Sequence, residues 1–140
     1  MQQELLSVML SWAVTLTGYS QPEHVPEVRL VSHQYLIDQA CNGRACKVMG
    51  WFPPGRTIYL DERLEPLDGT YASAVLLHEL VHYLQQESHK FASPYSCGDT
   101  IEMEHEAYGV QREYFLRYGV YQPVGASMHA VGCTAAAQQD

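Results

Sequence analysis

The sequence predicts an α+β domain in which a small, mostly antiparallel sheet packs on a buried helix. Two observations carry this prediction. Residues 74–85 read as a helix that is apolar on nearly every face. Short runs rich in β-branched and aromatic residues precede it and are separated by turn residues such as Pro53-Pro54-Gly55. In a chain of 140 residues, we expect one domain over residues 1–133 and a frayed tail over 134–140.

The elements before the buried helix follow from local patterns. Glu4 to Thr17 carries apolar residues at helical spacing and predicts an amphipathic first helix. Val28 to Val31 predicts a short strand, after which Ser32 is suited to cap a short helix. Cys46 to Phe52 and Arg56 to Leu60 predict two strands of a hairpin, because turn residues separate them.

The second half of the chain predicts two long helices. Thr70 or Ser73 is expected to cap the buried helix, which runs to about Glu87. Ser88 to Asp99 holds Ser, Pro, Gly and Cys residues and predicts a loop. A second long helix is expected from about Thr100 to Arg117, and its first turns are densely acidic.

Composition and charge exclude several classes of partner. The formal net charge is −8, and no cluster of Lys and Arg is present to bind phosphates, which argues against nucleic acid. The same negative charge gives no attraction to an anionic membrane surface. No apolar run approaches the roughly 18 residues of a membrane span. The first residues, Met1 to Leu6, lack the basic region that begins a signal peptide.

The four cysteines form an even set: Cys41, Cys46, Cys97 and Cys133. The first two bracket an Asn-Gly turn signal, so the chain should reverse there and bring their sulfurs together. A second disulfide between Cys97 and Cys133 would complete the pairing. If both form, the protein belongs to the periplasm or the extracellular space. The alternative is four reduced thiols in a cytoplasmic protein.

The buried helix contains the motif His78-Glu79-Leu80-Val81-His82, whose His and Glu residues are the candidates for a functional site. Residues four apart lie on one face of a helix, so the two imidazoles project side by side and can bind one Zn²⁺. Glu79 can reach water at the same site. The alternative is that both histidines are satisfied by hydrogen bonds in the core. We favour zinc, because two imidazoles and a carboxylate in so apolar a helix need a compensating charge.

A catalytic zinc takes three protein ligands and keeps one position open. The Gly-x-x-His that supplies a nearby third histidine in metzincins is absent after His82, and His89 lies near the helix end without that glycine turn. The acidic helix is therefore the expected donor of the third ligand. The carboxylates of its first turns are Glu102, Glu104 and Glu106.

The motif helix, followed by Glu104-His105-Glu106-Ala107-Tyr108, resembles the gluzincin metallopeptidases. The resemblance implies a zincin-like fold, and it assigns the third zinc ligand to Glu104, the first residue of the family's Glu-x-x-Ala-Asp. The chain is also similar, from Val28 to Arg117, to small bacterial domains with a His-Glu-Leu-Val-His helix and a later Glu-Ala-Tyr. Tyr108 stands where the gluzincins have Asp. Glu104, Tyr108 and Gln111 share one helical face, as a side turned toward a metal requires.

The function that this resemblance implies is zinc-dependent hydrolysis of peptide bonds. Glu79 is the expected general base, and Tyr108, Tyr95 and His105 are the candidates for stabilising the oxyanion. In the resembling fold an edge strand binds extended substrate, and Arg56 to Leu60 is the expected counterpart.

Two other functions remain open. The first is a catalytically inactive, zinc-stabilised binding module on the same fold. The second is an inactive precursor in which Cys133 or His129 occupies the zinc.

Overall fold

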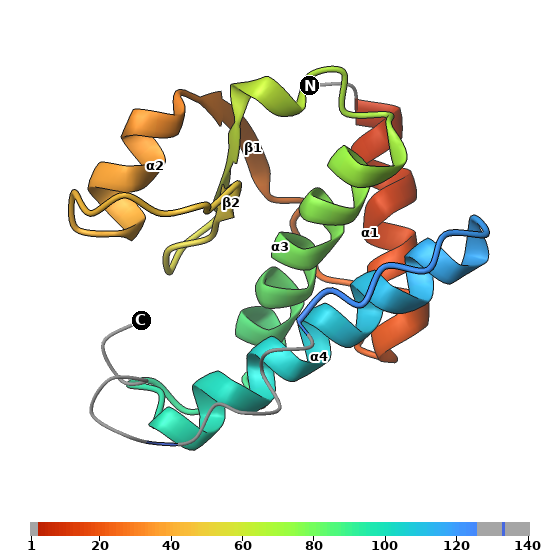
Figure 1. Cartoon of the computed structure of the whole chain (residues 1–140). Helices are drawn as coiled ribbons and strands as arrows, with labels where there is room; N and C mark the ends of the chain where they lie inside the picture. Colours follow the sequence, from red (N-terminus) through yellow and green to blue (C-terminus); the bar gives the residue numbers. More distant parts are fainter. Residues whose placement is uncertain (1–2, 126–132, 134–140) are drawn as a thin grey trace.

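The structure is a computed structural model, which describes residues 3–125 and residue 133. The described residues form four α-helices and a three-stranded sheet, so the predicted α+β class is confirmed. Figure 1 shows how these elements are arranged. No helix among the described residues is long and apolar enough to cross a membrane. The elements are α1 (Gln3–Thr17), β1 (Glu27–Val31), α2 (His33–Ala40), β2 (Gly50–Trp51), β3 (Thr57–Asp61), a 3₁₀ turn (Glu62–Leu64), α3 (Thr70–Ser88) and α4 (Cys97–Arg117).

The sheet is mixed, with strand order β1-β3-β2, so the predicted mostly antiparallel sheet is wrong. β1 and β3 are parallel over five residue pairs, from Glu27 with Thr57 to Val31 with Asp61. A parallel pair needs a crossover connection, and α2 lies in the chain between these strands. The hairpin of β2 and β3 is antiparallel, as expected.

The expected edge strand, Arg56 to Leu60, is also a wrong prediction. β3 lies at the centre of the sheet, between β1 and β2. Its side chains Ile58 and Leu60 are fully buried, which suits a strand that has neighbours on both sides. β2 is therefore the strand that offers a free edge beside α3.

β2 is shorter than the predicted Cys46 to Phe52, since only Gly50 and Trp51 pair with β3. Two causes limit it. The carbonyl of Cys46 is bonded to the ring of His33, and Pro53 has no N–H to continue the ladder. The pairing extends one residue further only through the carbonyl of Met49, which accepts from the Asp61 N–H at 2.8 Å.

Helix α3 lies at the centre of the molecule, as Figure 1 shows. α1 and α4 pack against it, and β2 and β3 contact it as well. The expectation that it is buried on nearly every face is confirmed. Its buried apolar side chains are Ala72, Ala74, Val75, Leu76, Leu77, Leu80, Val81, Tyr83 and Leu84. Burying that many apolar side chains stabilises the domain and fixes α3 against its neighbours.

Both long helices begin elsewhere than predicted. The N-cap of α3 is Gly69, with no side-chain cap, and the Ser73 hydroxyl instead donates to the Leu67 carbonyl at 2.7 Å. α4 begins at Cys97, three residues before the predicted Thr100. Ser96 and Asp99 form a capping box there, which satisfies backbone donors of the first turn.

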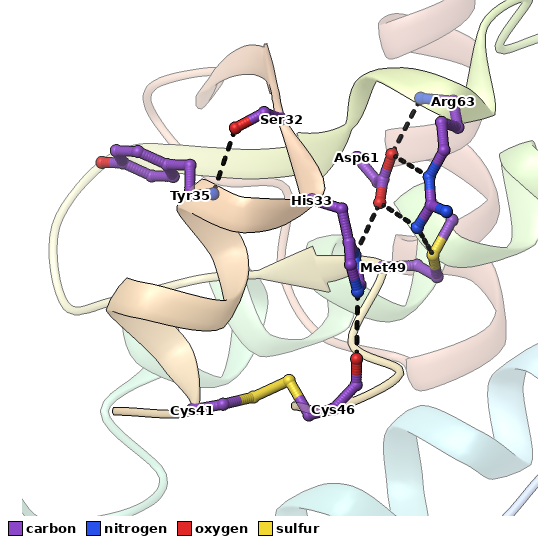
Figure 2. A network of polar contacts seen from close by, with 8 residues as sticks. All are labelled: Ser32, His33, Tyr35, Cys41, Cys46, Met49, Asp61 and Arg63. Atoms are coloured by element: carbon purple, nitrogen blue, oxygen red, sulfur yellow. Dashed lines mark hydrogen bonds and ion pairs between the residues drawn. A yellow bond between two sulfur atoms is a disulfide. The ribbon is translucent and has the colours of Figure 1, made fainter. Parts of the chain in front are cut away.

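A buried carboxylate, Asp61, ties the hairpin to α2, as Figure 2 shows. Its Oδ1 accepts from the backbone N–H and the Nε of Arg63, at 2.8 and 3.0 Å. Its Oδ2 contacts Arg63 Nη2 at 2.8 Å and His33 Nδ1 at 2.9 Å. Ser32 caps α2 as predicted, since its hydroxyl accepts from the Tyr35 N–H. The network therefore joins β3, α2 and the start of the 3₁₀ turn.

The two predicted disulfides are both present. Cys41 and Cys46 are joined with their Cα atoms 6.5 Å apart, and Cys97 is joined to Cys133 with a Cα distance of 5.5 Å. Cys133 therefore has no thiolate to offer a metal. His129 and the expected frayed tail, 134–140, lie outside the described residues.

The Asp61 network predicts an acid-sensitive contribution to stability. Hydrogen bonds from Arg63, and then from His33, outweigh burial and hold the pKa of Asp61 below its ordinary 3.8. Its stabilisation is thus complete above about pH 4 and is lost as the pH falls through the lower folded value. Asp61→Asn should reduce the free energy of unfolding at pH 7 by about 2–3 kcal/mol.

Urea unfolding at pH 7 and at pH 3 measures this effect. The difference between parent and Asp61→Asn should shrink at pH 3, whereas the exposed control Asp68→Asn should match the parent at both values. An equal loss at pH 7 and pH 3 would contradict the electrostatic account of Asp61.

Candidate metal centre

His78, His82 and Glu104 converge on one point between α3 and α4, and together they could hold a metal ion. The Nε2 atoms of the two histidines are 3.1 Å apart. Glu104 Oε1 lies 3.3 Å from His78 Nε2 and is bonded to His82 Nε2. The structure therefore brings together the three residues that the sequence proposed as ligands.

Two glutamines fix the orientation of these imidazoles. Gln111 Oε1 lies 2.6 Å from His78 Nδ1, and Gln85 Oε1 lies 2.7 Å from His82 Nδ1. The amide nitrogen of Gln85 donates to Glu106 Oε1 and to the Met103 carbonyl, both at 2.9 Å. That nitrogen is thus committed, so the oxygen of Gln85 faces the ring and His82 Nδ1 must carry a proton.

The tautomer decides what the other ring nitrogens can do. When Nδ1 donates to an amide oxygen, Nε2 of a neutral ring carries only a lone pair. Two such lone pairs then face each other beside the carboxylate of Glu104. Electron-rich atoms at this spacing, in a partly buried place, require a cation between them. Either a proton or a metal ion meets that requirement.

The protonation of the metal-free site follows the same logic. Burial alone would lower the pKa of His82, but its hydrogen bond to Glu104 and the charges of Glu79 and Glu104 raise that pKa to about 9. Burial pushes the pKa of Glu104 upward, yet the hydrogen bonds from His78 and His82 hold it well below its usual range. At neutral pH, His82 and Glu104 form a partly buried ion pair.

Glu79 lies beside the histidines and contributes no atom to the convergence point. It is 7% exposed and lines the same cavity as the three candidate ligands. Burial raises the pKa of its carboxyl, while the charges of His78 and His82 oppose that rise. A carboxylate next to a metal site that does not itself ligate is placed to handle a proton.

The candidates for oxyanion stabilisation differ in position. Tyr108 packs its ring against His78, with 4.6 Å between the centroids, and lines the cavity. Tyr95 lies at the cavity rim, 38% exposed, on the loop before α4. His105 is exposed and is not among the residues that line this cavity. Tyr108 and Tyr95 therefore share the cavity with the candidate ligands, whereas His105 lies on another side of α4.

Sequence reasoning missed the role of the two glutamines. Gln111, on α4, makes the hydrogen bond that orients the ring of His78. Its signal was present, since it shares a helical face with Glu104. Gln85 lies three residues after His82, where a helical neighbour can reach the ring. Its further bond to Glu106, which also accepts from the Tyr19 hydroxyl at 2.7 Å, had no sequence signal.

The cavity has a volume of about 720 Å³, within the range of natural ligand sites. It is lined by β2 and the residues around it, by α3 and by α4. Most of its lining is apolar or aromatic. The apolar and aromatic lining side chains are Val48, Met49, Trp51, Phe52, Pro54, Tyr71, Val75, Tyr95, Ile101, Met103, Tyr108 and Val124.

A family model described as a domain of unknown function, DUF6647, matches residues 1–138. The chain belongs to this family. Neither the curated proteins nor the solved structures contain a chain that matches it. The DUF6647 match spans both helices that carry the candidate ligands, so the site lies within the family's domain.

The ion pair predicts how zinc binding to this DUF6647 chain depends on pH. His82 has a pKa of about 9 in the metal-free protein, so it is protonated at pH 7 and must lose that proton to coordinate a metal. Zinc binding should release about one proton at pH 7 from this residue, and the release should vanish as the pH rises above 9.

Calorimetric titration of zinc in two buffers of different ionisation enthalpy measures the proton release. The exposed His105→Ala variant serves as the control and should release as many protons as the parent. Tight zinc binding at pH 7 without proton release would contradict the protonated His82.

The glutamine contacts predict a separate effect on metal affinity. Gln85→Met keeps the length of the side chain but leaves His82 Nδ1 without an acceptor. Zinc affinity should fall about 10- to 100-fold, the usual result of losing a partner that orients a ligand. Gln86→Met is the matched control, because Gln86 is bonded to the backbone of Gly55. Equal zinc affinity of the two variants, measured by competition with a chelator, would refute the role of Gln85.

Proposed function

We propose that this protein is a zinc-dependent peptidase of the zincin type. The observation that carries the proposal is the convergence of His78, His82 and Glu104 with a buried, non-ligating Glu79 beside them, all facing one cavity. The donor set of two imidazoles and one carboxylate suits zinc and leaves a position open. A site that served structure alone would have four protein ligands, and no need of Glu79.

Each residue around the site has a separate role in the proposed reaction. Bound zinc would supply Lewis acidity, which lowers the pKa of water and polarises a carbonyl. Glu79 accepts the proton of the attacking water and passes it to the leaving amine. Burial raises the pKa of Glu79, which makes its carboxylate a stronger base than that of an exposed glutamate. His78 and His82 are kept in one tautomer by Gln111 and Gln85, so their Nε2 atoms stay aimed at the site.

Tyr108 is the favoured partner for the developing oxyanion. Burial, and then the carboxylates of Glu104 and Glu79, raise the pKa of its hydroxyl. The hydroxyl therefore stays protonated at neutral pH and can donate a hydrogen bond. Tyr95, at the rim of the cavity, is the second candidate.

The cavity favours a polypeptide substrate with large apolar side chains next to the scissile bond. Its walls are mostly apolar or aromatic, and among the described residues Lys47 is the single cationic side chain that lines it, apart from the histidines. Because Gly50 and Trp51 belong to an edge strand and line the cavity, β2 takes the substrate-binding role that was expected of Arg56 to Leu60. An extended substrate can lie along this edge.

The two disulfides support an oxidising compartment, the periplasm or the extracellular space, for this activity. The substrates would then be unfolded or extended polypeptides outside the cytoplasm.

Glu79→Gln tests the proposed function most simply. The substitution keeps shape and hydrogen bonding but removes the base, so hydrolysis of unfolded casein should fall roughly 10²-fold or more. Zinc content and melting temperature should match the parent. Glu104→Gln should lose zinc affinity together with activity, whereas the exposed Glu102→Gln, on the same helix, should change neither.

Two results would contradict the proposed mechanism. One is a Glu79→Gln variant that cleaves as well as the parent. The other is a zinc-loaded parent that cleaves nothing in a broad peptide library, which would favour the catalytically inactive binding module.

A further inference from the structure

Gly50, in β2, lies close to the side chain of Glu79. A Cβ atom at this position would lie 2.9 Å from Glu79 Oε2, 3.0 Å from its Cγ and 3.2 Å from its Cδ. The first of these distances is shorter than real Cβ atoms show, and the other two are tighter than most Cβ contacts. The backbone of β2 therefore forms one wall of the space that the Glu79 carboxylate occupies, and a side chain at residue 50 would displace that carboxylate.

The register of the hairpin turns Gly50 toward α3. Gly50 is opposite Leu60 in the antiparallel pair, and residues opposite each other point to the same face of a sheet. Leu60 is fully buried in the core that α3 shares. The missing side chain of Gly50 thus belongs on the face where Glu79 lies, and not on the outer face of the sheet.

The segment that leads into β2 is bonded to the Asp61 network; Figure 2 shows the contacts of Asp61, His33 and Cys46. Just before β2, the Cys46 carbonyl accepts from His33 Nε2 at 3.0 Å, and the same ring contacts Asp61 through Nδ1. The Met49 carbonyl accepts from the Asp61 N–H. The Cys41–Cys46 disulfide closes the other side of this segment. Residues 46–50 are thus tied at both ends to α2 and β3.

We propose that Gly50 is a positioning residue for Glu79, and that the buried Asp61 network keeps Gly50 in place. A glutamate side chain has three rotatable torsions, and a wall in contact with its carboxylate excludes conformers that leave the site. The proposal rests on the proposed function, in which Glu79 is the general base. It goes beyond that function in one respect, because the backbone of β2 determines the position of the Glu79 carboxylate.

Gly50→Ala tests the proposal. The added methyl group should push aside the flexible end of Glu79 and leave the backbone unmoved, so kcat should fall about tenfold to a hundredfold with little change in KM. Zinc content should match the parent. Gly109→Ala is the matched control, because a Cβ there meets Arg112 Nη2 at an ordinary 3.6 Å; its kcat should equal that of the parent.

A double-variant comparison separates positioning from general damage to the cleft. In the Glu79→Gln background no base remains to be misplaced, so adding Gly50→Ala should change kcat little. Asp61→Asn, which loosens the wall without touching Glu79, should show the same dependence on background when assayed well below its unfolding temperature. An equal loss in both backgrounds, or no loss in either, would overturn the proposal.

A crystal structure of Gly50→Ala with zinc supplies a measurement that needs no substrate. The proposal expects the Glu79 carboxylate to be displaced away from residue 50. A carboxylate in its parental place beside a shifted β2 would overturn it. If the carboxylate is displaced and neither parent nor variant hydrolyses peptides, the wall is established while the peptidase function fails, so the two proposals can be told apart.

Discussion

The structure depends on one electrostatic constraint, the meeting of two imidazole nitrogens and a carboxylate oxygen between α3 and α4. Gln85 and Gln111 fix both rings so that their free nitrogens face each other, 3.1 Å apart. Only a cation relieves that arrangement. A proton on His82 does so in the metal-free state, and zinc is the ion that the donor set suits. The packing of α4 on α3 is therefore coupled to what occupies the site.

In a chain of this size, one helix, α3, forms the centre of the core and also carries residues of the candidate site. Its apolar faces hold α1, α4 and the sheet together, while one stripe carries His78, Glu79 and His82. The cleft then needs a wall on each side. β2 supplies one wall, tied down by Asp61 and the Cys41–Cys46 disulfide, and α4 supplies the other, with Cys97 at its start joined to Cys133. Short, cross-linked segments thus form both walls.

The sequence predicted what is local and periodic. The motif helix, the acidic helix, the cap at Ser32 and the turn between Cys41 and Cys46 each depend on neighbours in the chain, and each is found. The predicted strand order was wrong because a hydrophobic pattern does not show whether a strand pairs with its neighbour through a hairpin or across a helix such as α2. The contact of Gly50 with Glu79 joins residues 29 positions apart, and no spacing rule reaches that far.

X-ray absorption at the zinc edge, on protein purified without added metal, shows whether His78, His82 and Glu104 bind zinc. We expect one zinc per chain, with two imidazole nitrogens and oxygen ligands at roughly 2.0–2.2 Å and no sulfur neighbours. In the His82→Ala variant the second imidazole should disappear. Two results would contradict the assignment of this site. One is a protein that carries no zinc and binds none when zinc is added, and the other is a zinc ion surrounded by sulfur.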